Sequence, residues 1–125
     1  MATVKEVYKQ AKDLIFEKPT STIYDNVVIT HLNRLLVELF AENNLARVRN
    51  GKEKKDAPQV IPRTNYNNIE IDLEDEYLSN VLPLGLAAQF LIDDDLNKYA
   101  IYNTYYNNAR VTAQRLVGKK KYDAS

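Results

Sequence analysis

The sequence predicts a mainly all-α protein of about four helices packed as a small bundle, with an extended arm or short β-hairpin between the second and third helices. Apolar residues recur at intervals of three and four in four stretches, and a polar, loop-like stretch divides the second from the third. With 125 residues, 45% hydrophobic and 27% charged, the chain has the composition of one folded domain. We expect residues 1–118 to form this helical domain, with a loop or arm at 51–72, and residues 119–125 to form a flexible tail.

The first helix is expected to begin at Thr3. Thr3 and Glu6 have capping-box spacing, in which each side chain bonds the backbone amide of the other residue. Lys18 precedes Pro19, and the residue before a proline is disfavoured in a helix, so the pattern ends there. The apolar stripe consists of Val4, Val7, Tyr8, Ala11, Leu14 and Ile15.

The second helix carries the strongest apolar stripe of the chain. Hydroxyl and carboxylate side chains in residues 20–25 offer N-terminal caps. The helix is expected to end near residues 43–44 or after Val48, because Asn50 and Gly51 supply a left-handed stop. The stripe consists of Val28, Leu32, Leu35, Leu36, Leu39 and Phe40.

Residues 51–68 are polar and contain Pro58 and Pro62, which is loop composition. Residues 59–61 and 69–71 are short β-prone pieces on either side of a turn region. They either pair as a small hairpin or form extended arms that offer unpaired backbone groups to a neighbouring subunit. The residues predicted to lie at such an interface are Val60, Ile61, Tyr66, Ile69 and Ile71.

The third helix is expected over residues 74–92 and contains Pro83. A proline in a helix interior removes a hydrogen bond and clashes one turn back, so a kink or a restart is predicted within residues 79–83. The acidic residues 93–95 then cap a fourth helix, which is expected to stop at Gly118.

The fourth helix is rich in tyrosine. Tyr99, Tyr102 and Tyr106 fit one stripe, whereas Tyr105 points elsewhere. Tyrosine offers a large contact area with a polar tip, so Tyr105 is a predicted contact for a partner. The alternative is a tyrosine-rich core whose hydroxyl groups reach solvent. The basic residues predicted to join Tyr105 in a partner contact are Lys119, Lys120 and Lys121.

The charges of the chain are balanced but segregated. The 17 basic and 17 acidic residues give a formal net charge of zero. One block is basic, with Arg47, Arg49, Lys52, Lys54 and Lys55, and a second is acidic, with Glu70, Asp72, Glu74, Asp75 and Glu76. A basic edge of one subunit can meet the acidic edge of the next, which favours head-to-tail self-association. Taken alone, the basic residues fit a solvated loop and tail, contact with an acidic protein surface, or contact with nucleic acid.

No catalytic residue, cofactor site or metal site is predicted. The absence of cysteine excludes thiol catalysis and zinc sites with cysteine ligands. The three glycines stand too far apart for a phosphate-binding loop. His31, the only histidine, belongs to no catalytic motif, and residues 93–95 are better explained as a helix cap than as a metal site. We therefore expect a protein that is not an enzyme.

No apolar run approaches the roughly 20 residues that a membrane-spanning helix needs. The N-terminal residues 1–12 have an amphipathic helical pattern rather than that of an export signal. We expect synthesis in the cytoplasm and no contact with a membrane.

Residues 82–91, with the sequence LPLGLAAQFL, are followed by three aspartates and by a helix that includes YYNNA at residues 105–109. This segment resembles small structural proteins of tailed bacteriophages and prophages, in particular the head-tail connector, or adaptor, proteins of the virion neck. Those proteins often combine a helix containing leucine-proline and glycine-leucine-alanine-alanine with a short acidic break and an aromatic helix. The similarity covers the third and fourth predicted helices and extends to residues 35–40 of the second.

The resemblance implies a non-catalytic virion structural protein that forms a homo-oligomeric ring and joins the portal and capsid vertex to tail or neck proteins. It would be present in the bacterial cytoplasm during viral assembly and then in the virion neck, with any DNA contact secondary. The alternative, a small helical DNA-binding or regulatory protein of a prophage, rests on the basic loop and tail. A carboxylate-dependent hydrolase would rest on the acidic runs alone.

Overall fold

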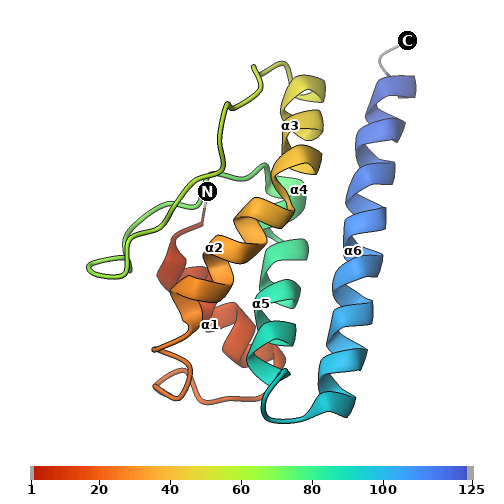
Figure 1. Cartoon of the computed structure of the whole chain (residues 1–125). Coiled ribbons are helices and arrows are strands. Elements are labelled where there is room, and N and C mark those ends of the chain that lie inside the picture. Colours follow the sequence, from red (N-terminus) through yellow and green to blue (C-terminus); the bar gives the residue numbers. More distant parts are fainter. Residues whose placement is uncertain (1, 124–125) are drawn as a thin grey trace.

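The structure is a computed structural model that describes the backbone of residues 2–123 and the side chains of residues 2–115, and it confirms the predicted all-α class. Figure 1 shows α6 running antiparallel to α5, with α1 and α2 on the other side of α5. No helix within residues 2–123 has both the length and the apolar content needed to cross a membrane. In chain order the helices are α1 (Val4–Leu14), α2 (Val28–Glu38), α3 (Phe40–Arg49), α4 (Asp75–Leu78), α5 (Val81–Leu91) and α6 (Leu96–Asp123).

Helix α5 lies at the centre of the core and packs against α1, α2, α4 and α6. All of its residues except Leu84 and Gln89 are buried, as expected for a helix that is apolar on every side. The ring of Phe90 stacks on that of Tyr24 with centroids 4.3 Å apart. The α5 sequence therefore supplies most of the surface on which the other helices pack.

Three local predictions about helix ends are confirmed. Thr3 and Glu6 form the predicted capping box at the start of α1. Gly51 has a φ of 81° just after α3, in the left-handed region that the predicted stop requires. After α4 the chain restarts as α5, which places Pro83 in the first turn, where its missing N–H breaks no helical hydrogen bond.

Other helix boundaries differ from the predictions. The second helix is divided at Leu39 into α2 and α3. The backbone N–H of Asn43, in α3, donates to the backbone carbonyl of Leu39. No side chain from residues 20–25 caps α2, whose N-cap is Val27, because these residues form turns instead.

Gly118 does not end the fourth helix, since the backbone of α6 continues to Asp123. A glycine inside a helix costs only about 1 kcal/mol relative to alanine, which a long helix tolerates. Residues 119–123 are thus helical. Of the tail predicted at 119–125, residues 124–125 lie outside those that the structure describes, and its flexibility stays a prediction.

The predicted hairpin is wrong, because the described residues contain no strand and residues 69–71 lie beside the N-terminus. The Val4 amide donates to the Ile69 carbonyl, and the Ile71 amide donates to the Ala2 carbonyl, each over 2.9 Å. Ile61 and Ile71 are 1% and 0% exposed and belong to the core. The extended segment therefore packs on its own chain, and these two isoleucines are not available to a neighbouring subunit.

Candidate functional site

Side-chain amides take the place of a second strand beside the extended segment that follows α3. The Asn33 amide receives a hydrogen bond from the Ile61 backbone N–H over 2.8 Å and donates to the Ile61 carbonyl over 3.0 Å. Asn44 makes the same pair of bonds with the backbone of Lys55, at 2.9 and 3.0 Å. Because an amide carries both a donor and an acceptor, it satisfies both backbone groups of one residue.

Two further amides fix the end of this segment. The Gln59 amide donates to the Glu70 carbonyl and accepts from the Asp72 N–H, at 2.9 and 2.8 Å. The side-chain carbonyl oxygen of the buried Asn43 accepts a hydrogen bond from the backbone N–H of Glu74 over 2.7 Å. Asn43, where the second helix was expected to end, thus lies inside α3 and holds the chain as it enters α4.

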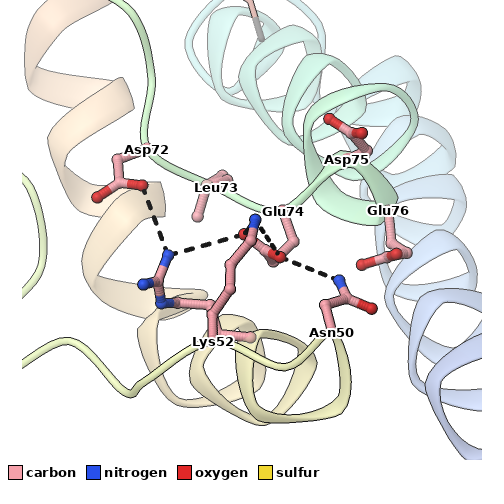
Figure 2. A pocket seen from close by; sticks show the side chains of 8 residues that line it. Asn50, Lys52, Asp72, Leu73, Glu74, Asp75 and Glu76 are labelled. Atoms are coloured by element: carbon pink, nitrogen blue, oxygen red, sulfur yellow. Dashed lines mark hydrogen bonds and ion pairs between the residues drawn. The ribbon is translucent and has the colours of Figure 1, made fainter.

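The Glu74 cluster joins the two predicted charge blocks within one chain, and Figure 2 shows Asn50, Lys52, Asp72 and Glu74 of it. The cluster consists of Arg47, Asn50, Lys52, Lys55, Asp72 and Glu74. The Lys52 ammonium lies 2.9 and 3.0 Å from the two carboxylate oxygens of Glu74, and the Asn50 amide donates to the same carboxylate over 3.0 Å. Arg47 lies between the carboxylates of Glu74 and Asp72, at 3.8 and 4.0 Å. Lys55 completes the cluster with a 2.7 Å contact to Asp72.

Glu74 is the only carboxylate of this cluster that is buried, with 4% of its side chain exposed. Burial by itself raises the pKa of Glu74, but hydrogen bonds from Asn50 and Lys52 and the charges of Lys52 and Arg47 outweigh it and lower the pKa. Glu74 is therefore ionised at neutral pH, and its charge is balanced by partners from the end of α3 and the loop that follows.

Side chains of the Glu74 cluster line part of a polar hollow of about 410 Å³. Figure 2 shows the side chains around this hollow. The lining has four carboxylates and no hydroxyl or imidazole group, and two of these carboxylates, Asp72 and Glu74, pair with cations of the cluster. Within the described residues, no three acidic or histidine side chains are grouped so as to hold a metal ion. The ion pairs anchor the loop that follows α3. The lining residues are Arg47, Asn50, Lys52, Asp72, Leu73, Glu74, Asp75 and Glu76.

The Arg110 cluster, consisting of Glu38, Glu42, Tyr106, Arg110 and Gln114, attaches α6 to the junction of α2 and α3. The Arg110 guanidinium donates to Glu38 over 3.0 Å and to Glu42 through two nitrogens. The Tyr106 hydroxyl donates to Glu38 over 2.6 Å, and the Gln114 amide donates to Glu42 over 2.9 Å. The sequence analysis missed this cluster, although two glutamates four residues apart on one helix are a signal for a basic partner.

Burial is the main reason why the pKa of Tyr106 is raised above its ordinary value, and the hydrogen bond to Glu38 adds to it. Its hydroxyl therefore stays protonated and serves as a donor. The pKa of His31 is lowered, chiefly by burial and further by the charge of Arg34. The His31 ring lies against Phe90 with centroids 6.1 Å apart, which agrees with a packing role.

The structure separates the predicted interface residues into three groups. Val60 is 78% exposed, and Tyr105 is also exposed, as predicted from its place outside the tyrosine stripe. The second group belongs to the core: Ile61 and Ile71 are fully buried in it, and Tyr66 and Ile69 are partly buried against it. The side chains of Lys119, Lys120 and Lys121 lie outside those that the structure describes.

Five of the ten predicted electrostatic contacts pair with one another inside the chain: Arg47, Lys52, Lys55, Asp72 and Glu74. Within one chain these residues therefore already have partners, and contact between two subunits through them stays a prediction. Among the described residues, Arg49, Lys54, Glu70 and Asp75 form no ion pair, and Glu76 lines the polar hollow.

The acidic run before α6 has a capping role, as predicted. The Asp95 carboxylate accepts a hydrogen bond from the Lys98 amide over 3.1 Å. Asp94 accepts from the Tyr24 hydroxyl over 2.9 Å, which ties the turn to the segment before α2. Together they fix the direction in which α6 leaves α5.

Comparison of the chain with family models, with curated proteins and with solved structures yields no match.

Proposed function

We propose that this protein is a non-catalytic structural component of a tailed-phage virion, of the head-tail connector type. The observation that carries the proposal is the close packing of Gly85 against Tyr106. A Cβ atom at Gly85 would lie 2.8 Å from Cε1 of the tyrosine. Both residues belong to the segment that resembles connector proteins, and their contact brings α5 and α6 close together.

The polar clusters agree with a structural role. The Glu74 cluster and the Arg110 cluster each connect elements that are far apart in the sequence. Both are built from charged groups that already have partners. They support a scaffold that keeps its shape when it is placed in a larger assembly.

The DNA-binding alternative loses much of its basis. Arg47, Lys52 and Lys55, which belong to the basic block proposed to contact phosphates, engage Asp72 and Glu74. Phosphate contact would require these ion pairs to break, so their contribution to nucleic-acid affinity is small.

A ring of this protein would join the portal to tail or neck proteins, and the exposed face of α6 around Tyr105 is available for subunit contacts. Light scattering and electron microscopy of the protein mixed with portal protein from the same genome test the proposal. We expect complexes larger than the portal ring alone, with added density on its outer end. A protein that remains monomeric and joins neither portal, capsid nor tail proteins would contradict it.

A further inference from the structure

The outward side of α2 and α3, opposite the side that faces the core, carries five exposed apolar residues among a threonine and an arginine. One side faces the core, and the other carries a continuous outer row with spacings of three and four residues. The outer row consists of Val27, Thr30, Arg34, Val37, Ala41, Leu45 and Val48, all of them exposed. Val37 is 63% and Leu45 59% exposed, so the row is not covered by the rest of the chain.

An apolar stripe at this spacing is the feature by which helices pack on one another. The outer row extends across the junction of α2 and α3, and Figure 1 shows these two helices following one another along one side of the molecule. Its geometry therefore fits a second helix laid along it rather than a loop.

The charges beside the outer row determine which helix fits. Arg34 lies within the row and Arg49 beside its end, and neither has an ion pair or hydrogen bond within the described part of the chain. The acidic residues on the same helices, Glu38 and Glu42, are neutralised by Arg110. The row thus presents apolar side chains with unbalanced positive charge, which attracts an acidic partner.

A second copy of this chain is a poor partner for the outer row. In a parallel pair Arg34 would face its own counterpart, and in an antiparallel pair it would approach Arg49, so both arrangements bring like charges together. The exposed side of α1 carries Lys5 and Lys9 beside Glu6 and Asp13, so its charges cancel, and α6 has no acidic residue before Asp123. The acidic α4 has only four residues, which is too short to cover the row.

From this combination we infer that the outer row of α2 and α3 is a docking site for an acidic amphipathic helix of another protein. Apolar residues of that helix would cover Val37, Leu45 and Val48, and its carboxylates would pair with Arg34 and Arg49. This inference stands apart from the proposed virion role, since a helical protein of any function could carry such a site.

Two synthetic helical peptides of about 20 residues test the inference. Both have the same leucine row, and one carries glutamates where the other carries lysines. In fluorescence anisotropy we expect the acidic peptide to bind the full-length protein more tightly than the basic one, and added salt to weaken it. Leu45→Asp should weaken the acidic peptide about tenfold or more, because it places a charge under the apolar contact.

The double variant Arg34→Glu, Arg49→Glu gives the sharper result, because it should reverse the preference and favour the basic peptide. Both arginines are exposed, and circular dichroism checks that the variant keeps the wild-type fold. The matched control, Val60→Asp with Arg63→Glu, changes an exposed apolar and an exposed basic residue on the extended segment and should leave binding unchanged.

Several results would overturn the inference. Equal affinities of the protein for the acidic and the basic peptide would show that charge does not select the partner. An affinity for the acidic peptide that Leu45→Asp leaves unchanged would show that the peptide binds elsewhere. Absence of binding at any peptide concentration tested would show that the row is no docking site. A dimer in sedimentation analysis that Leu45→Asp abolishes would show that a second copy covers the row.

Discussion

Gly85 lies so close to Tyr106 that no side chain fits between α5 and α6 at this point. A Cβ atom at residue 85 would be 2.8 Å from Cε1 of Tyr106 and 3.0 Å from Cδ2 of Leu35. Tyr106 cannot move aside easily, since its hydroxyl donates to Glu38 and its side chain is buried. The glycine therefore sets the distance between the two helices that carry the resemblance to connector proteins.

Gly85→Ala should destabilise the protein, although alanine favours a helix more than glycine does. Overpacking costs about 1–3 kcal/mol, and the gain in helix propensity offsets about 1 kcal/mol of it. Denaturant unfolding should show a lower free energy of unfolding. In a Tyr106→Leu background, which removes the ring, the same substitution should cost less. An equal or stabilising effect in both backgrounds would show that the contact is unimportant.

Glu74→Gln should make the protein less stable at neutral pH and reduce its sensitivity to acid. The pKa of Glu74 in the folded protein lies below its ordinary value of 4.5, so the carboxylate stabilises the fold above that pH. This stabilisation is lost as the pH falls through the lowered pKa. We expect a cost of about 1–3 kcal/mol, because Arg47 and Lys52 lose their buried partner.

Unfolding curves measured across the acid range check this prediction. The stability of the wild-type protein should fall more steeply below pH 4.5 than that of Glu74→Gln. Glu70→Gln, at an exposed glutamate without an ion pair in the described residues, is the control and should behave like wild type. Parallel acid profiles for wild type and Glu74→Gln would be incompatible with the ion pairs of the Glu74 cluster.

Removing the amide at Asn33 should loosen one point of the extended segment and leave another unchanged. In Asn33→Ala the backbone N–H of Ile61 loses its acceptor, so its hydrogen exchange should accelerate about fivefold. The Lys55 amide should not change, because Asn44 still holds it. Asn44→Ala should give the opposite pattern, and the two variants thus control each other. Uniform acceleration along the segment in both would mean that the amides do not act locally.

Neighbouring residues of the extended segment should respond differently to the same substitution. Ile61→Asp places a charge in the core and should cost about 3 kcal/mol or more, whereas Val60→Asp, at a 78% exposed site, should stay within about 0.5 kcal/mol of wild type. Thermal unfolding of the two variants measures the difference. A stable Ile61→Asp protein would restore the arm that the sequence analysis predicted for assembly.

Local signals in the sequence were sufficient for the features that depend on neighbouring residues. The capping box at Thr3, the restart around Pro83 and the stop at Gly51 each follow from the conformations of a few adjacent residues. The tyrosine stripe of α6 follows from helical periodicity alone, and Tyr105 is exposed as that periodicity predicts.

Features that depend on distant contacts were not predictable in the same way. The β-prone residues around Ile61 fit an arm that binds a neighbouring subunit as well as a segment that covers the core of its own chain. Only the fold shows that Ile61 belongs to the core. Charge blocks indicate that opposite charges can meet but not whether they meet within one chain or between two. The amide pairs of Asn33 and Asn44 cannot be read from sequence, because they join residues 28 and 11 positions apart.

Quantitative mass spectrometry of purified tailed particles, produced by bacteria that carry the gene, tests the proposed virion role most directly. The proposal predicts that the protein is present in these particles at a fixed ratio to the portal protein, as a closed ring requires. Particles that are complete and infectious but contain none of the protein would contradict it.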